Sequence, residues 1–260
     1  MRQFIIQSHP DKKGLVQVEG KDFHYLRQVL RVKAGDMVVL RLADGSLENS
    51  TVCKIDDRGK KITLQVCGVG EVLAPPPVEY SLFQFIPKPQ KLELIVRQAT
   101  ECGVKNIIPV ISEYTQKGNV QALSGGRIER LQRIVREARQ QSGSPVDTTV
   151  FEPVTVEQAA DLWNKIKEEA GSPEACAGFV LSERGGEDEG PSKGGTSSAS
   201  ATPQFVAIFC GNEGGISPDE LELLIKKALL CPIHFSVNIL RCETAALYGI
   251  AAIQTSISGI

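Results

Sequence analysis

The sequence of 260 residues has little of what metal sites and disulfide-stabilised folds are built from. Only three histidines are present, His9, His24 and His234, and none of the seven cysteines forms a CxxC pair. A transition-metal site usually needs such residues at short spacing, so we expect chemistry without a metal. Most of the cysteines stand inside apolar runs, where cysteine behaves as a small hydrophobic residue, and a reducing cytoplasm is the expected location.

Long apolar runs and a strong net charge are missing as well. No stretch approaches the roughly 20 apolar residues of a membrane-spanning helix, and the apolar run at the amino terminus is too short for a signal peptide. We therefore expect no membrane association. The formal net charge is only −2, so a nucleic-acid partner would have to meet a local basic patch.

What is present is an ordinary globular composition in a chain long enough for two domains. Residues 1–72 alternate short apolar segments with turn signals, which predicts a small β-rich domain. One amphipathic stretch, residues 21–31, interrupts them and predicts a helix with Arg27 and Arg31 on a polar face. The apolar face of this predicted helix is made of Phe23, Leu26, Val29 and Leu30.

A second, larger domain is predicted after a proline-rich linker. Three consecutive prolines within residues 73–78 cannot continue a strand ladder and favour an extended spacer. Residues 79–260 then alternate strands with helices, which is typical of an α/β fold with a largely parallel sheet covered on both faces. Residues 184–203 are nearly free of large apolar side chains and are predicted to form a flexible insert in this domain.

The stretch CGNEGG, residues 210–215, follows a predicted buried strand and leads into a helix. Its glycines let the backbone approach a ligand, and open α/β sheets bind ligands at the carboxyl ends of their strands. The pattern is neither GxxxxGK[ST] nor GxGxxG, so it supports no nucleotide P-loop or dinucleotide site. Residues 217–220, SPDE, predict a capping box with proline at the first helical position. On this stretch alone, a plain turn and a ligand site are equally good interpretations.

Residues 234–254 follow the same order of strand, irregular loop and helix. Arg241 and Glu243 stand where the helix begins, either as a surface pair in which the acid favours the helix dipole or as part of a site. The final helix, residues 243–258, is apolar nearly all round. It is therefore expected to be central or to be buried against a second subunit.

Taken together, GNEGGISPDE, NILRCETAALYGIAAIQ, RQATECGVKNIIPVISEYTQKG and REARQQSG resemble the RsmE family of small-subunit ribosomal RNA methyltransferases. The segment HYLRQVLRVKAGDMVVL is similar to the amino-terminal RNA-binding domain of that family, so the resemblance covers essentially the whole chain. It implies a SPOUT-type parallel sheet with a carboxy-terminal trefoil knot, and a small amino-terminal PUA-like β-barrel. Sequence physics alone would not predict a knot.

The activity that the resemblance implies is methylation of uracil N3 at a single uridine in the decoding region of 16S rRNA, of the uracil(1498)-N(3) type. S-adenosyl-L-methionine would be the methyl donor, the assembled small subunit the substrate, and a homodimer the active form. Two alternatives stay open: a catalytically inactive SPOUT-fold RNA-binding protein associated with the ribosome, and a ribose 2′-O-methyltransferase, which shares the glycine turn.

The resemblance also implies where the cofactor binds. Three loops should hold it, at residues 180–183, 210–215 and 235–245, with backbone groups reading the adenine edge and apolar side chains packing on the base. The predicted cofactor-binding residues are Leu181, Ser182, Gly211, Asn212, Glu213, Gly214, Gly215, Ser236, Val237, Ile239, Leu240, Thr244 and Ala245.

For the chemistry, Arg241 is predicted to stabilise the uracil anion, with Glu213 or Glu243 as base or positioner. Capping of a helix without any chemistry is an equally good interpretation of Glu213. The predicted RNA-binding residues are Arg2, Arg27, Arg31, Lys33 and Arg136. The basic residues of the first domain could instead form a solvated face without a partner. The arginines of the helix that begins at residue 127 could instead pair with Glu129 and Glu137.

Three positions depart from the pattern of the family. The family usually has proline where this chain has Asn212, and arginine where it has Asn238 and near Ser144. An arginine that is missing cannot make its usual contact with RNA or with the reacting groups. These departures motivate the alternative of an inactive RNA-binding protein.

Overall fold

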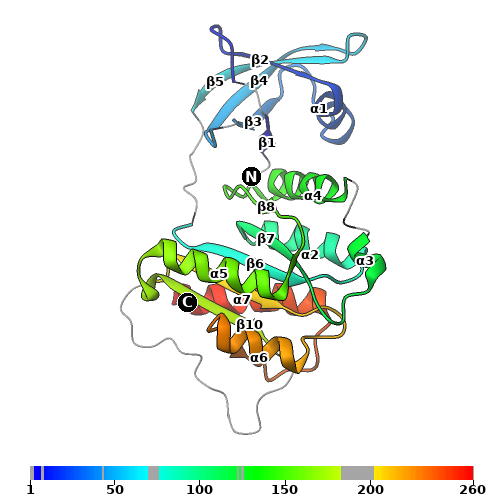
Figure 1. Ribbon diagram of the computed structural model, residues 1–260. Coiled ribbons are helices and arrows are strands. Elements are labelled where there is room, and N and C mark those ends of the chain that lie inside the picture. The colour runs from blue at the N-terminus through cyan, green and yellow to red at the C-terminus, as the bar shows by residue number, and fades with distance from the viewer. Residues whose placement is uncertain are drawn as a thin grey trace. The chain divides into compact units, whose positions relative to one another are not determined.

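The computed structural model describes residues 3–6, 9–42, 44–69, 76–121, 123, 126–182 and 202–259. The predicted insert therefore lies almost entirely outside the described residues, as does much of the predicted linker. The chain divides into two compact units, shown in Figure 1. The first unit comprises Met1–Pro75 and Arg139–Pro145, and the second comprises Pro76–Ala138 and Val146–Ile260. No helix of the described residues is long and apolar enough to cross a membrane.

The first unit is built on a five-stranded sheet. Its strands are β1 (Phe4–Ile5), β2 (Leu15–Glu19), β3 (Met37–Arg41), β4 (Leu47–Asp56) and β5 (Lys61–Val69). They lie in the order β1-β3-β4-β5-β2, with β1 and β3 parallel and the other neighbours antiparallel. Alternate residues such as Val16, Val18, Ile62 and Leu64 point into one buried core, as the period of two in a strand requires.

The predicted helix of this unit has two different parts. Residues Gly20–His24 form helix α1, and Tyr25–Val29 continue it as the π-helix η1. The wider turn of a π-helix changes the angle between successive side chains, so the face predicted for an α-helix is not preserved. Leu26 is fully buried, whereas Val29, which was predicted on the same face, is 64% exposed.

The second unit alternates strands and helices along the chain. Its strands are β6 (Glu79–Phe85), β7 (Asn106–Ile111), β8 (Thr149–Val150), β9 (Val154–Thr155), β10 (Cys176–Leu181), β11 (Phe205–Cys210) and β12 (Cys231–Ile233). Its helices are α2 (Pro89–Glu101), α3 (Lys117–Gln121), α4 (Arg127–Ser142), α5 (Val156–Ala170), the 3-10 helix η2 (Pro173–Ala175), α6 (Pro218–Lys227) and α7 (Cys242–Ser258). The last residues of α4 group with the first unit.

All strands of the second unit pair in parallel, in the order β12-β10-β11-β6-β7-β8, with β9 also on β7. This confirms the predicted α/β fold with a parallel sheet. The central strands β6 and β11 are buried on both faces, which explains the continuous apolar sequence of β11. In β6, Ser81 and Gln84 are buried polar residues.

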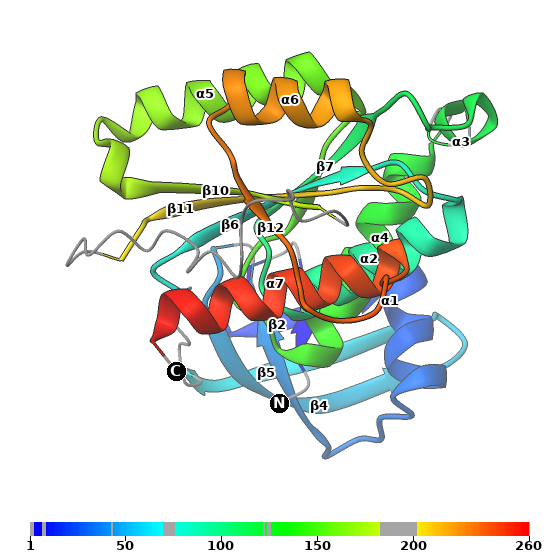
Figure 2. The same ribbon diagram turned by 90° about the horizontal axis from the view of Figure 1, so that it is seen from below.

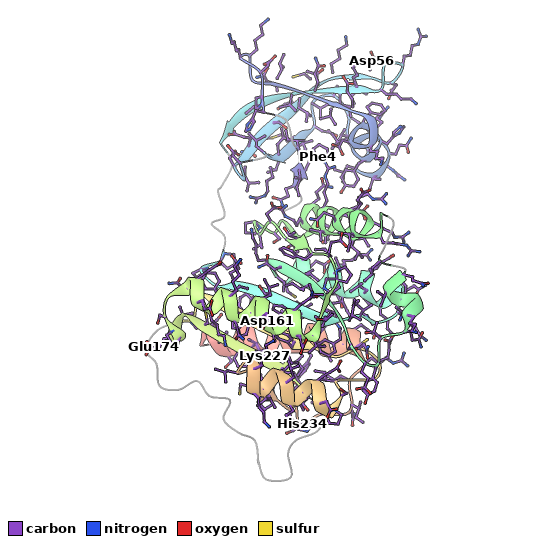
Figure 3. All side chains as sticks on the ribbon, viewed as in Figure 1. Phe4, Asp56, Asp161, Glu174, Lys227 and His234 are labelled. Atoms are coloured by element: carbon purple, nitrogen blue, oxygen red, sulfur yellow. The ribbon has the colours of Figure 1, made fainter. Side chains whose placement is uncertain are left out.

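Helices cover both faces of this sheet, as Figure 2 shows. Residues of α2, α4 and α7 join one buried core, and residues of α5 and α6 join the other. On the second face, Lys227 of α6 and Asp161 of α5 point toward one another at 2.7 Å (Figure 3). Helix α7 packs through Ala246, Ile250 and Ile253, whereas Tyr248 on its other side is 44% exposed.

Candidate functional site

The glycine turn follows β11 at the carboxyl end of the sheet and is closely packed on itself. The amide of Gly215 donates to the carbonyl oxygen of Asn212 at 3.0 Å, and Gly215 has a φ of +78°. A Cβ added at Gly211 would lie 2.8 Å from the carbonyl carbon of Gly215, and one at Gly214 would lie 2.8 Å from Cβ of Tyr114. Larger residues would therefore push the turn open, which explains the glycines.

Asn212 ties this turn to the neighbouring strands. Its side chain is buried, and its Oδ1 accepts a hydrogen bond from the amide of Gly214 at 2.9 Å. Its Nδ2 donates to Oγ of Ser112 at 3.1 Å and to the carbonyl oxygen of Ile86 at 3.4 Å. These partners follow the ends of β7 and β6, so the amide holds the turn where a proline would only restrict its backbone.

Helix α6 begins directly after the turn, as predicted. Ser217 and Glu220 form the capping box, and Pro218 stands at the start of the helix. The other carboxylate oxygen of Glu220 accepts the backbone amide of Glu113 at 2.8 Å. The start of α6 is thus fixed both by its own cap and by the loop after β7.

A pocket of about 500 Å³ lies against the glycine turn, with further walls from the ends of β10 and β12 and from the loop before α7. The volume falls in the range of small-molecule sites. Predicted cofactor-binding residues that line it are Leu181, Ser182, Gly211, Asn212, Gly214, Gly215, Val237, Ile239, Leu240 and Ala245. The predicted residues Glu213, Ser236 and Thr244 are not among the lining residues.

Sequence reasoning missed several residues that line the same pocket. Those outside the three predicted loops are Tyr114, Ile216, Pro218, Leu221 and His234. Cys210, Phe235, Asn238 and Cys242 lie inside those loops but were not among the predicted cofactor-binding residues. Widening each loop by one residue would have added Ile216 and His234. Tyr114 is different, because it comes from the loop after β7. The rule that ligands bind beyond the carboxyl ends of parallel strands was the available signal.

The loop before α7 is held from both sides. The backbone amide of Ser182 donates to the carbonyl oxygen of Ile233 at 3.0 Å, which joins the ends of β10 and β12. The ring of Phe235 packs edge-on against Tyr248 of α7, with ring centroids 4.8 Å apart. Ile239 is 82% exposed although it lines the pocket. The loop therefore offers apolar surface that a ligand could cover.

The two acids predicted for the chemistry meet at one lysine, which sequence reasoning did not identify. Lys91 stands in the first turn of α2, and its Nζ lies 3.0 Å from Oε2 of Glu243 and 3.7 Å from Oε1 of Glu213. Oε1 of Glu213 also accepts the backbone amide of Lys88, the N-cap residue of α2, at 3.1 Å. Glu213 thus caps another helix of the chain, as its structural interpretation predicted.

These contacts set the charges around Cys242, which lines the pocket. Burial, together with its hydrogen bond to Glu243, raises the pKa of the Cys242 thiol to about 12. Burial raises the pKa of Glu243, but its own backbone amide and the hydrogen bonds from Lys91 and Cys242 outweigh that effect and lower it. Chiefly through its bond to Glu243, Lys91 has a raised pKa. Near neutral pH Cys242 therefore keeps its proton, Glu243 is a carboxylate and Lys91 is an ammonium.

Arg241 is the N-cap residue of α7 and directly precedes Cys242 in the sequence. Its side chain is exposed. Its carbonyl oxygen accepts the amides of Thr244 and Ala245 at 2.8 and 2.7 Å, which fixes the backbone at this point. Within the part of the chain that the structure describes, no ion pair engages its side chain. The guanidinium can therefore reach an anionic group that approaches the loop.

The predicted RNA-binding residues are distributed over both units. In the first unit, Arg27 forms a bidentate pair with Asp57, with contacts of 2.9 and 3.2 Å, while Arg31 and Lys33 are exposed. In the second unit, Arg136 is half-buried on α4. Arg2 lies outside the described residues.

The arginines of α4 do not all pair along their own helix. Arg130 pairs with Glu93 of α2, its Nε 2.8 Å from the carboxylate, rather than with Glu129 or Glu137. This pair lies between two helices on the same face of the sheet. Arg130 therefore has a structural contact already, which makes it a weaker candidate for contact with RNA.

Comparison with known proteins places the chain among RNA methyltransferases. Residues 74–254 match the family described as RNA methyltransferase domain. The chain is 31% identical over 233 residues to "Ribosomal RNA small subunit methyltransferase E" of Rickettsia conorii, covering 89% of this chain and 85% of the relative. The protein of the same name from Synechocystis is 27% identical over 242 residues, covering 93% of this chain and 73% of the relative.

A solved structure has the same fold. It is the ribosomal RNA small subunit methyltransferase E of Neisseria gonorrhoeae, bound to S-adenosyl methionine, and it aligns with a TM-score of 0.77 at 21% identity. The alignment covers 98% of each chain.

Proposed function

Because the chain belongs to the RNA methyltransferase domain family, and within it to the ribosomal RNA small subunit methyltransferases E, we propose that it methylates uracil N3 of one uridine in 16S rRNA. The observation that carries this proposal is the pocket at the carboxyl ends of β10, β11 and β12, walled by a glycine turn. S-adenosyl-L-methionine is the proposed methyl donor, and the assembled small ribosomal subunit is the proposed substrate.

The residues of the pocket fit this cofactor. The turn between Gly211 and Gly215 exposes backbone rather than side chains, which suits hydrogen bonds to adenine and ribose edges. Leu181 and Leu240 line the same pocket and supply apolar surface for the base. When bound, the cofactor supplies a methyl group activated by its sulfonium charge. The chain itself has to orient the uracil, remove water and stabilise the charge that develops.

In the proposed reaction, the bond from the methyl carbon to sulfur breaks as the bond to uracil N3 forms. The N3 proton leaves to solvent water, and the negative charge of the uracil is carried by its oxygens. Arg241 is the proposed stabiliser of this charge, because its side chain is exposed and it stands between Leu240 and Cys242, which line the pocket. Glu243 is assigned a positioning role, because a carboxylate with a lowered pKa is a weak proton acceptor. Glu213 is assigned a positioning role because its carboxylate accepts the backbone amide of Lys88 and lies 3.7 Å from Nζ of Lys91.

The assignment to Arg241 is tested by the substitution Arg241→Ala. We expect methylation of small ribosomal subunits to slow by about 100-fold, the usual cost of losing one charge-stabilising donor, with cofactor affinity nearly unchanged. Single-turnover methylation and calorimetry with S-adenosyl-L-methionine measure the two quantities separately. Normal methylation by this variant would show that another group stabilises the uracil.

The first unit is the proposed RNA-binding domain, of PUA-like form, over residues 1–72, and residues 79–260 are the proposed SPOUT domain. The five-stranded sheet and the exposed Arg31 and Lys33 support the first assignment. The trefoil knot in the second is proposed from the resemblance to the family, and it would involve the segment around β12, which pairs with β10 on the edge away from β11. The homodimer is proposed through the exposed side of α7.

The decisive experiment separates an enzyme from an inactive binding protein. The purified protein is titrated with S-adenosyl-L-methionine and is then incubated with labelled cofactor and small subunits from a strain that lacks it. Mapping the label should find one uridine methylated at N3, in subunits but not in free 16S rRNA. A label on a ribose 2′-oxygen, or cofactor binding that is absent altogether, would overturn the proposal.

A further inference from the structure

Lys91 lies where three segments that are far apart in the sequence come together. It stands in the first turn of α2, Glu213 belongs to the glycine turn, and Glu243 lies in the first turn of α7. The ammonium group of Lys91 contacts both carboxylates, at 3.7 and 3.0 Å. Within the described residues, no other lysine or arginine forms an ion pair with either acid.

The two carboxylates need this cation because they are only partly exposed to solvent. The side chain of Glu213 is 33% exposed and that of Glu243 is 17% exposed, so water screens their repulsion incompletely. Removing one partner of such a group leaves charge that nothing nearby compensates. The glycine turn and the start of α7 would then tend to separate.

Cys242 connects this group to the pocket. Its side chain lines the pocket, its Sγ donates to Oε2 of Glu243 at 3.3 Å, and Nζ of Lys91 lies 3.8 Å from the same sulfur. The thiol keeps its proton because its pKa is raised to about 12. A shift of Glu213 or Glu243 would therefore move a wall of the pocket itself.

We propose that Lys91 is a positioning residue of the pocket: its ammonium holds Glu213 and Glu243 together and so fixes the glycine turn against the start of α7. This role requires no contact between Lys91 and the cofactor or the uracil. Its consequence for cofactor binding rests on the proposed function, whereas the ion pairs themselves do not.

The proposal predicts a change in the titration of Glu243. The charged and titratable groups that face this carboxylate are Lys91 on α2, Glu213 on the turn and Cys242 on its own helix. Lys91 is one of the groups that lower the pKa of Glu243. Without the ammonium, burial and the charge of Glu213 remain, so the pKa of Glu243 should rise.

The first test is a carbon-13 NMR titration of the side-chain carboxyls in the full chain without cofactor. Lys91→Met removes the charge with little change of volume, Lys91→Arg keeps the charge, and Glu243→Gln identifies the signal. We expect the Glu243 midpoint to rise by about one pH unit in Lys91→Met and to return in Lys91→Arg. The matched control is Lys165→Met, which breaks the exposed pair with Glu169 on α5 and should leave the midpoint unchanged. An unchanged midpoint in Lys91→Met overturns the proposal.

The second test is calorimetry with S-adenosyl-L-methionine on the same variants, after their unfolding midpoints have been compared. Lys91→Met should weaken binding about tenfold, while Lys91→Arg and Lys165→Met should stay within about threefold of the unaltered protein. Normal binding by Lys91→Met overturns the positioning role even if the titration of Glu243 shifts. If the unaltered protein does not bind the cofactor while the Glu243 midpoint responds, the proposed function fails and the ion pairs stand.

Discussion

Asn212 is a buried polar residue that uses both ends of its side-chain amide. The oxygen organises the turn by accepting the Gly214 amide, and the nitrogen attaches the turn to Ser112 and Ile86. Each neutral hydrogen bond contributes about 1 kcal/mol, and a buried group that loses its partner costs more. The resemblance to the family leads one to expect a proline here, which would make the turn rigid. In this chain, the directed hydrogen bonds of Asn212 take over that role.

This interpretation predicts that two substitutions at this position affect cofactor binding to different degrees. Asn212→Ala removes all of these bonds and should weaken binding of S-adenosyl-L-methionine about tenfold, since the turn loses its attachment. Asn212→Pro restricts the backbone of the turn instead and should stay within about threefold of the unaltered protein. Calorimetry at one temperature measures the affinity of the unaltered protein and of both variants for S-adenosyl-L-methionine.

Equal losses in both variants would mean that the side-chain bonds, rather than rigidity, hold the turn. No loss in Asn212→Ala would contradict the role of the amide altogether. Ser112→Ala is the matched control, because it removes one hydroxyl that accepts from Nδ2 and leaves the carbonyl oxygen of Ile86 and Oγ1 of Thr115 as acceptors. This variant should bind the cofactor more weakly than the unaltered protein but more tightly than Asn212→Ala.

At the scale of single residues, sequence reasoning was strongest where residues are close along the chain. The three loops that it selected contribute most of the pocket, from Leu181 to Ala245. It could not find Lys91, because nothing in the local pattern of α2 distinguishes a lysine that pairs across the fold from one that is solvated. Its interpretation of Glu213 was open for the same reason, since the capped helix is not the one that follows the turn.

Helices α5 and α6 have matching starts, which makes a controlled comparison possible at the scale of elements. Thr155 and Gln158 form the capping box of α5, and Ser217 and Glu220 form that of α6. Both capping boxes provide hydrogen-bond acceptors for backbone amides that would have no partner at the start of the helix. Of helices α5 and α6, it is α6 that borders the pocket, through Pro218 and Leu221.

Ser217→Ala and Thr155→Ala should each lower the free energy of unfolding by about 1 kcal/mol, the usual cost of a lost N-cap. Urea unfolding followed by circular dichroism measures this loss. Cofactor affinity should fall several-fold in Ser217→Ala alone, because the first turn of α6 is part of the pocket wall. If Thr155→Ala weakens binding as much, the effect is one of overall stability and not of the cap of α6.

Elements were predicted best where apolar residues extend over many positions. Helix α7 (Cys242–Ser258) begins one residue before the predicted helix 243–258 and ends at the same residue. The helix at residues 21–31 was predicted as one α-helix, but its second half is the π-helix η1. A π-helix differs from an α-helix by one residue per hydrogen-bonded turn, which the pattern of Phe23, Leu26 and Leu30 does not encode.

At the scale of the whole molecule, the parallel sheet followed from the alternation of strands and helices, but its strand order did not. Position along the chain cannot say that β12 lies beside β10, or that residues 139–145 group with the first unit while the rest of α4 belongs to the second. Such groupings depend on contacts between segments distant in sequence. The pocket depends on them too, since Tyr114 reaches it from the loop after β7.

The proposed homodimer is a further property of the whole molecule, and the structure suggests where to test it. Helix α7 is buried along one side, and its exposed side carries small and apolar residues at helical spacing: Thr244, Tyr248, Ala251, Thr255 and Ser258. Such a side without charge is typical of a surface that another subunit covers. Tyr248 also packs on Phe235 of the pocket loop, so the same surface adjoins the site.

Ala251→Arg places a long charged side chain in the middle of this surface and should convert a dimer into a monomer. Sedimentation equilibrium measures the mass, and calorimetry on the same samples should show weaker cofactor binding in the monomer, because Tyr248 would lose support for the pocket loop. Glu168→Arg, on the exposed side of α5, is the matched control and should remain a dimer. A dimer that survives Ala251→Arg would place the interface elsewhere, and an unaltered protein that sediments as a monomer would contradict the homodimer itself.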